Sequence, residues 1–228
     1  MQPFPWVCTC TSSWPGALPA IGGATARQAA ETLSNYYEPG PLVLLQRPVA
    51  LIGFPGVDQH GLGRDLAALA GLPLIEVDRW IEHEAGQSLG ALVQSQGLTA
   101  LRQLEDRFLN RALDARPPGV LVLGDGTLIK AANCQRVVAE TTLVYLKISL
   151  AGAYWNLRHY AQEKARRPHP LLLQPPDNMA QLKPLFAQRL AGFEQAHLTL
   201  DMDAMTPSAA LRHLLDLMPQ WSTAPPTH

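Results

Sequence analysis

The segment with the clearest chemical spacing is glycine-rich, Gly53–Arg64, and reads GFPGVDQHGLGR. It follows an apolar run with strand character, Val49–Ile52, and precedes a helical run that begins at Leu62. A strand, a glycine turn and a helix are the setting in which the motif G-x-x-x-x-G-K-[ST] cradles the phosphates of a nucleotide. The segment therefore has the architecture of a phosphate-binding loop.

Three positions of this motif carry other residues. In register with Gly53, the second glycine falls on Asp58, the lysine on Gln59 and the serine or threonine on His60. The motif lysine brings positive charge to the phosphates, and the hydroxyl binds Mg²⁺. Glutamine carries no charge, Mg²⁺ prefers oxygen to imidazole nitrogen, and an aspartate repels a polyanion. The loop predicts weak or absent ATP turnover, and a strand–turn–helix that never bound phosphate is the alternative.

Further segments extend the pattern from about residue 47 to about residue 218. They are Arg47–Gly56, Gly63–Ala67, Leu74–Asp78, Ile81, Glu82, Gly86, Gly97–Glu105, Val120–Gly126, Val144–Leu146, Arg166–Leu172 and Arg189–Phe193. In order and spacing, this set resembles the shikimate kinase family, with a degenerate Walker A loop. The degenerate nucleotide-binding loop comprises Gly53, Gly56, Asp58, Gln59, His60 and Gly61.

The resemblance implies a second site, for the acid substrate. Its substrate-binding residues are Asp78, Arg102, Arg189, Gly124 and Gly126. Two arginines from distant segments would clamp a carboxylate, because a guanidinium holds it through a planar fork. Asp78 would accept hydrogen bonds from ring hydroxyls and is the candidate catalytic base. Asp125 stands where the family has the middle glycine of a trio.

Other roles implied by the resemblance concern the lid and the metal. Arg166 and Arg167 fall at the lid. No metal is expected, and Glu76 is the metal neighbour if Mg²⁺ is bound. We expect no cofactor, with Mg²⁺ and ATP only if the chain is an active kinase.

Each acid-site residue also has a plain structural explanation. Arg102 lies three residues before Glu105 and could form only a helix-surface ion pair. Asp78 could cap a helix that begins at Arg79, and Arg189 could be a solvated helix residue. The three together, in family register, favour a binding site.

These motifs leave three functions open. The first is a shikimate kinase-like protein that binds shikimate or a related small hydroxy-carboxylate but has lost or strongly reduced phosphoryl transfer. The second is an active shikimate kinase with an atypical phosphate loop. The third is a ligand-free scaffold or regulatory partner, so a protein partner is an open expectation.

The elements that must position these residues alternate along the chain. We expect strands at Val49–Ile52, Leu74–Val77, Val120–Leu123, Leu143–Ile148 and Leu198–Leu200. Helices are expected at Leu62–Ala70, Arg79–Glu84, Leu89–Gln94, Leu98–Leu113, Asn133–Val138, Ala151–Glu163, Ala180–Gln195 and Ser208–Leu217. Continuous apolar strands between helices predict one α/β domain of the P-loop kinase type, with a doubly wound sheet of five parallel strands in three layers. Gly53, Asp78 and Gly124 fall at strand carboxyl ends, where such sheets bind ligands.

The ends of the chain differ in composition from its middle. We expect a flexible extension over residues 1–45, a shikimate-kinase-like domain over 46–218 and a disordered tail over 219–228. The extension has no acidic residue before Glu31 and no apolar core of a secretory signal. We predict a cytoplasmic location, with a plastid as the alternative if the extension is a transit peptide.

Composition excludes two classes of partner. The chain has 228 residues, 47% of them hydrophobic, and a formal net charge of −1. This charge gives no electrostatic basis for binding nucleic acid or an acidic membrane. No run approaches the roughly 20 apolar residues that span a bilayer.

Overall fold

The protein is described by a computed structural model over residues 45–160 and 176–223. The strands are β1 (Val49–Gly53), β2 (Leu74–Glu76), β3 (Val120–Val122), β4 (Thr142–Lys147) and β5 (Leu198–Asp201). The α-helices are α2 (Gln59–Ala70), α3 (Val77–Ala85), α4 (Leu89–Leu113), α5 (Ala131–Glu140), α6 (Leu150–Tyr160), α7 (Lys183–Phe193) and α8 (Pro207–Thr223). Two short 3-10 helices are η1 (Thr127–Ile129) and η2 (Met179–Gln181).

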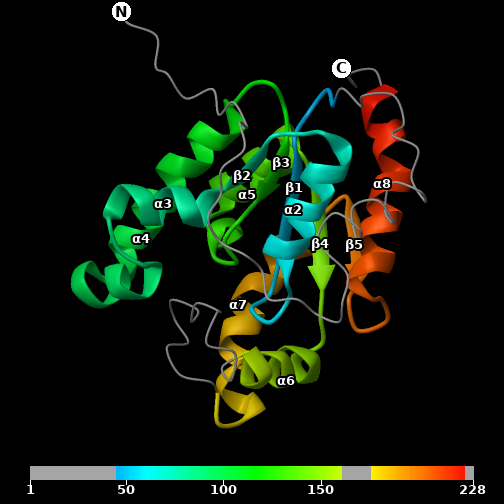
Figure 1. Ribbon diagram of the computed structural model, residues 1–228. Helices are drawn as coiled ribbons and strands as arrows, with labels where there is room; N and C mark the ends of the chain where they lie inside the picture. Colours follow the sequence, from blue (N-terminus) through cyan, green and yellow to red (C-terminus); the bar gives the residue numbers. More distant parts are fainter. Residues whose placement is uncertain (1–44, 161–175, 224–228) are drawn as a thin grey trace, which may run out of the picture. The chain divides into compact units, whose positions relative to one another are not determined.

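The five strands form one parallel sheet in the order β2-β3-β1-β4-β5 (Figure 1). Leu51 at its centre pairs with Val122 on one side and Val144 on the other. Each strand agrees with its predicted range to within one residue at either end. The expected α/β domain with a five-stranded parallel sheet is therefore confirmed.

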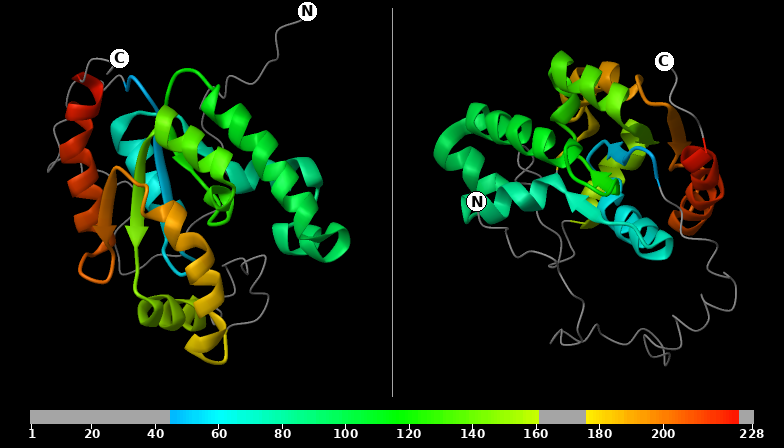
Figure 2. Two further views of the ribbon diagram at one scale, coloured as in Figure 1. Left: turned by 180° about the vertical axis from the view of Figure 1, so that it is seen from behind. Right: turned by 90° about the horizontal axis from the view of Figure 1, so that it is seen from above.

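Helices cover both faces of this sheet. Successive side chains of a strand point to opposite faces, so β1 contributes to two separate cores. Val49 and Leu51 pack with residues of α2 and α8. Ala50 and Ile52 pack with residues of α3, α4, α5 and α7. Figures 1 and 2 show α2 and α8 on one face and α4, α5 and α7 on the other.

Helix α4 is kinked at Gly97, which separates two helical segments as predicted. Gly97 has φ 84° and ψ 167°, a conformation that breaks the helical path without ending the element. Only glycine adopts this positive φ at no steric cost. The gap between the two predicted helices thus corresponds to the non-helical backbone conformation of Gly97.

Several predicted helix boundaries were wrong, among them those of α7, which spans Lys183–Phe193 rather than Ala180–Gln195. Helix α2 begins at Gln59, three residues before the predicted start, because the Asp58 carboxylate caps it by accepting a hydrogen bond from Gly61 N. Helix α8 continues to Thr223, so residues 219–223 are helical rather than part of a disordered tail. Leu45, assigned to the extension, is buried in the core beside α8. The rest of the extension and the lid residues Arg166 and Arg167 lie outside the described residues.

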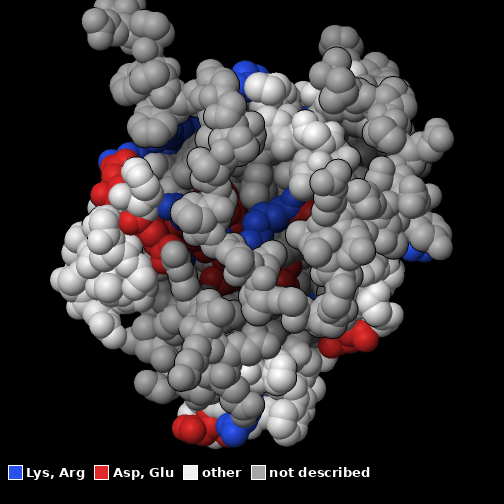
Figure 3. Space-filling view, viewed as in Figure 1, with Lys and Arg blue, Asp and Glu red and all other residues white. Residues whose placement is uncertain are grey.

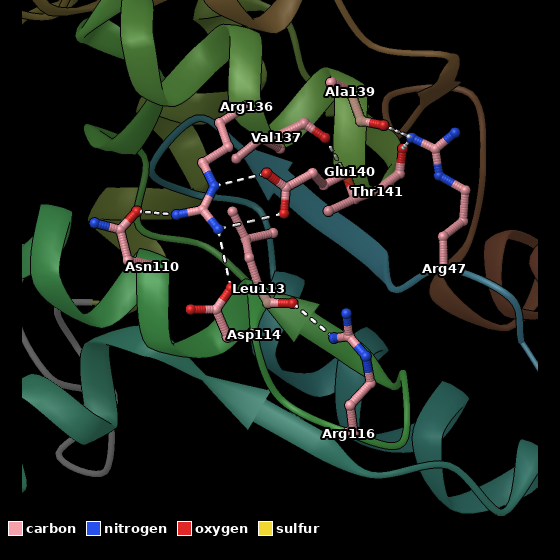
Figure 4. Close-up of polar contacts among 10 residues, drawn as sticks. All are labelled: Arg47, Asn110, Leu113, Asp114, Arg116, Arg136, Val137, Ala139, Glu140 and Thr141. Atoms are coloured by element: carbon pink, nitrogen blue, oxygen red, sulfur yellow. Dashed lines mark hydrogen bonds and ion pairs between the residues drawn. The ribbon is translucent and has the colours of Figure 1, made fainter. Parts of the chain in front are cut away.

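At the end of the sheet where the strands begin, arginine side chains join α5 to the start of β1 and to the end of α4. Arg47, just before β1, places its Nη2 within hydrogen-bond distance of three carbonyl oxygens at the end of α5. Figure 4 shows the contacts with Ala139 and Thr141. The acceptors are the carbonyl oxygens of Val138, Ala139 and Thr141, at 3.0, 2.7 and 2.5 Å. The last carbonyls of a helix lack partners within it, so these bonds satisfy groups that would otherwise need water. Arg136 joins α5 to α4 by pairing with Asp114 at 3.0 Å.

Candidate functional site

The glycine loop after β1 lies where it was predicted and packs closely against α6. Gly56 has φ +108° and lies against α6, where an added Cβ would approach the Ala153 carbonyl oxygen to 3.0 Å. Asn156 of α6 donates a hydrogen bond of 2.9 Å to the Gly56 carbonyl oxygen. The Asp58 carboxylate fills the space beside Gly61 that a Cβ there would need. The loop is thus held by its own helix cap and by α6.

Gln59, at the motif's lysine position, is a buried structural residue. Its side-chain Nε2 donates a hydrogen bond of 2.9 Å to the Leu123 carbonyl oxygen at the end of β3. The residue is only 8% exposed. Its side chain also borders Gly53, because an added Cβ on Gly53 would lie 3.5 Å from Gln59 Oε1 and 3.1 Å from the Leu146 carbonyl oxygen. Gln59 therefore ties the loop to the sheet, where a lysine would reach toward phosphate.

His60, at the hydroxyl position of the motif, contacts the carboxylate expected near a metal. His60 Nδ1 lies 2.9 Å from Glu76 Oε1, and Arg79 Nε lies 2.9 Å from Glu76 Oε2. Burial acts to raise the pKa of Glu76, but the hydrogen bond from His60 and the charges of Arg79, His60 and Arg64 outweigh it and lower that pKa. Glu76 is therefore an ionised carboxylate whose two oxygens already have cationic or imidazole partners.

These contacts do not fit a magnesium nucleotide. Both Glu76 oxygens are engaged, and the nearby His60 offers nitrogen where Mg²⁺ requires oxygen. Within residues 45–160 and 176–223, no group of three or more His, Cys, Asp and Glu side chains could hold a metal ion. We derive no phosphoryl-transfer step through this loop.

The acid-site residues meet at the turn after β3, Gly124–Gly126. Asp78, from the first turn of α3, packs against Gly124, where an added Cβ would lie 2.6 Å from Asp78 Oδ1. A Cβ on Gly126 would overlap the guanidinium of Arg102, from α4. Arg189, from α7, pairs through Nε with the Asp125 carboxylate between them. Three elements far apart in sequence thus bring one carboxylate and two guanidinium groups to three consecutive residues.

Arg102 is held by Glu105, one helical turn further along α4. Arg102 Nη1 donates to Glu105 Oε1 at 2.6 Å and to Oε2 at 2.5 Å. Burial is the largest influence on Glu105 and raises its pKa to about 7, against the attraction of Arg102 and with repulsion from Asp78 and Asp125. The predicted ion pair exists, but Glu105 is only 4% exposed, so the pair is not a surface feature.

Arg189 is a core residue rather than a solvated one. It is 1% exposed and is one of the largest fully buried side chains among the described residues. Its Nη1 donates to the Leu185 carbonyl oxygen at 3.0 Å, and Nε meets Asp125. Among the described residues, Nη2 is buried and has no hydrogen-bond acceptor. Such a guanidinium costs stability unless its charge is compensated, which Asp125 does here.

Charged side chains of both signs gather in the hollow at the centre of the face seen in Figure 3. Asp78 does not cap the helix from outside, since α3 begins at Val77 and Asp78 lies in its first turn.

No helix among the described residues is both long and apolar enough to cross a membrane.

Comparison with known proteins gives this geometry a family. The shikimate kinase profile matches residues 56–219, more than half of the chain. The chain belongs to the shikimate kinase family. The shikimate kinase of Xanthomonas campestris pv. campestris is 32% identical over 175 residues, covering 76% of this chain and 93% of that enzyme. The shikimate kinase of Thermobifida fusca is 34% identical over 175 residues, covering 76% and 96%. A third relative, from Paracidovorax citrulli, is 36% identical over 115 residues and is matched over 63% of its length.

Solved structures of shikimate kinases share the fold. The enzyme from Acinetobacter baumannii, in complex with shikimate, superposes with a TM-score of 0.66 at 21% identity and covers 79% of this chain and 98% of its own. The enzyme from Bacteroides thetaiotaomicron gives a TM-score of 0.65 at 21% identity, covering 75% and 98%. At this identity the likeness shows the P-loop kinase fold and no more.

Sequence reasoning missed two contacts of this shikimate kinase-family site. Asn156 reaches the glycine loop from α6, and no motif marks it. Asp125 was noticed as a break in a glycine trio, but its pairing with Arg189, 64 residues away, was not predicted. The break itself was the available signal, because a carboxylate beside two expected arginines is a natural ion-pair partner.

Proposed function

We propose that this shikimate kinase-family protein binds shikimate or a related small hydroxy-carboxylate and has lost or strongly reduced ATP-dependent phosphoryl transfer. The observation that carries the proposal is the fate of the motif's lysine position. Gln59 is uncharged and buried, and its Nε2 donates a hydrogen bond to the Leu123 carbonyl oxygen. Removing one preorganised donor to a transition-state charge typically costs roughly 10²–10³ in rate. His60 and Asp58 add to this loss through their own contacts with Glu76 and Gly61.

The ligand side is supported by the convergence at Gly124–Gly126. Arg102 and Arg189 would bind the carboxylate, and Asp78 would accept hydrogen bonds from ring hydroxyls. Gly124 and Gly126 have a steric role as well, since a side chain at either would displace Asp78 or Arg102. In an active enzyme Asp78 would take the proton of the attacking hydroxyl.

An active kinase with an atypical loop is the second candidate. The curated relatives that cover most of this chain are named shikimate kinases, which favours it. In that case ATP and Mg²⁺ would be required, and arginines such as Arg64 or the lid residues Arg166 and Arg167 would reach the phosphates. A cytoplasmic location and a protein partner stay predictions.

Two titrations separate these functions. Calorimetry of the wild type with Mg²⁺-ATP and with shikimate is expected to give heat of binding for shikimate only. Binding of both, with ADP release in a coupled assay, would establish the active kinase instead. Binding of neither would indicate a scaffold or regulatory partner.

A variant of the loop tests the cause of the lost activity. Asp58→Gly, Gln59→Lys and His60→Ser together are expected to confer measurable Mg²⁺-ATP binding, because the preceding strand, Gly53 and the following helix are intact. Unchanged shikimate affinity in this variant is the control that it has folded. No gain in nucleotide affinity in a folded variant would place the defect outside the loop.

A further inference from the structure

Asp125 forms an ion pair with Arg189, the guanidinium that the proposed function assigns to the ligand's carboxylate. Arg189 is fixed in place by its hydrogen bond to the Leu185 carbonyl oxygen and by complete burial of its side chain. Its Nε faces the Asp125 carboxylate, whose side chain is 13% exposed. Nε and Nη2 form one edge of a guanidinium, the edge through which a carboxylate binds with two parallel hydrogen bonds. Asp125 pairs with Nε, one of the two donors on that edge.

Both guanidinium groups of the site already have carboxylate partners without a ligand. Arg102 is paired with Glu105, and Arg189 is paired with Asp125. Asp78 adds a further carboxylate beside Gly124. An incoming carboxylate therefore meets two guanidinium groups with carboxylate partners and a third carboxylate nearby. Like charges at such distances oppose binding, most strongly where water is excluded.

We propose that Asp125 is a specificity-determining residue that competes with the ligand's carboxylate for Arg189 and so weakens the site's preference for acids over uncharged polyhydroxy ligands. This inference rests on the proposed function, because it assumes that a small hydroxylated ligand binds at the Gly124–Gly126 turn. A glycine at position 125 has no carboxylate to compete. Asp125 thus sets which charge the ligand carries, while Asp78 and the turn recognise its hydroxyls.

The test compares an acid with its uncharged counterpart. Shikimate and shikimate methyl ester are titrated by calorimetry into the wild type, Asp125→Asn, Asp125→Gly and Asp114→Asn. Asp125→Asn keeps the side-chain shape and an oxygen that accepts from Arg189 Nε. Asp114→Asn is the matched control, because it neutralises an aspartate that pairs with Arg136 at the other edge of the sheet.

The wild type is expected to bind the acid and the ester with similar affinity. Both Asp125 variants should then bind the acid about tenfold or more tightly, the gain from one charge-assisted contact, with the ester changed little. Asp114→Asn should alter neither. The proposal is overturned if the wild type prefers the acid by more than about tenfold, or if folded Asp125→Asn leaves the ratio of acid to ester affinity unchanged.

Two further outcomes are decided by the same data. If neither compound binds the wild type or the variants, the proposed function fails. The proposal that Asp125 competes with the ligand's carboxylate then fails with it. If the variants do not fold, as judged by thermal melting and circular dichroism, the ratio measured on the wild type decides alone. A ratio near one supports competition, and a strong preference for the acid refutes it.

Discussion

Replacement of Glu105 by glutamine should remove a large part of the pH dependence of stability. Glu105 is nearly fully buried, and its pKa rises from the usual 4.5 to about 7 in the folded protein. A raised folded-state pKa means that the protonated form favours folding, so the contribution is complete below pH 4.5 and is lost as pH rises through 7. At about 1.4 kcal/mol per pKa unit, the full effect is about 3 kcal/mol. Two influences oppose each other here, because Arg102 lies only 2.5 Å away and lowers the same pKa.

Urea unfolding of the wild type and Glu105→Gln at several pH values between 5 and 8.5 measures this effect. The free energy of unfolding of the variant, relative to the wild type, should rise by about 2–3 kcal/mol over that range. Titrating groups that do not interact with Glu105 cancel in the difference. Glu105→Asp is a useful second variant, because it keeps the charge but not the reach to Arg102. A difference that stays flat from pH 5 to 8.5 would refute the reasoning and show that attraction to Arg102 outweighs burial.

Other perturbations probe separate contacts. Gly126→Ala should push the Arg102 guanidinium aside without backbone strain, because Gly126 has φ −88°. Shikimate binding should then weaken by about tenfold or more. Unchanged affinity in calorimetry would exclude Arg102 from the site. His197, whose pKa is lowered by burial and by the charge of Arg47, accepts a hydrogen bond from Leu143 N through Nδ1. Its contribution to stability is therefore present above pH 6.5 and lost as pH falls below it, and His197→Asn should reduce that acid sensitivity in urea melts. Arg47→Met should lower the free energy of unfolding by about 1–3 kcal/mol, because its contacts with three carbonyl oxygens are lost. Arg107→Met, at an exposed arginine, is the control. A smaller loss of stability for Arg47→Met than for Arg107→Met would contradict the role of Arg47.

The sequence predicted the sheet well, because its central strands β1 and β3 are continuous apolar runs buried on both faces. Val120–Val122, for example, is fully buried and follows the predicted limits almost to the residue. Helix limits were harder to place, since the start of α2 depends on one side-chain hydrogen bond, from Gly61 N to Asp58. Gln59 and His60 were singled out because they depart from the phosphate-loop motif. Their partners were not predictable, because Leu123 and Glu76 reach them only through the order of the strands.

The same reason limited the prediction of the acid site. Asp78, Arg102 and Arg189 were proposed from family register, and the structure brings them to one turn. The spacing of Arg102 and Glu105 predicted their ion pair, but nothing in the register revealed that Arg189 also has a carboxylate partner there. Pairing of Arg189 with Asp125 depends on how α7 packs against the turn after β3, which no local pattern encodes.

The Asp58 cap bears on how a nucleotide site could be built into this loop. Glycine at position 58 would remove the cap of α2, and lysine at position 59 would place a charge where a neutral donor now meets the Leu123 carbonyl oxygen. Each of these substitutions made alone is therefore expected to lower stability. Under the proposed loss of phosphoryl transfer, a nucleotide site is regained only when the substitutions are made together.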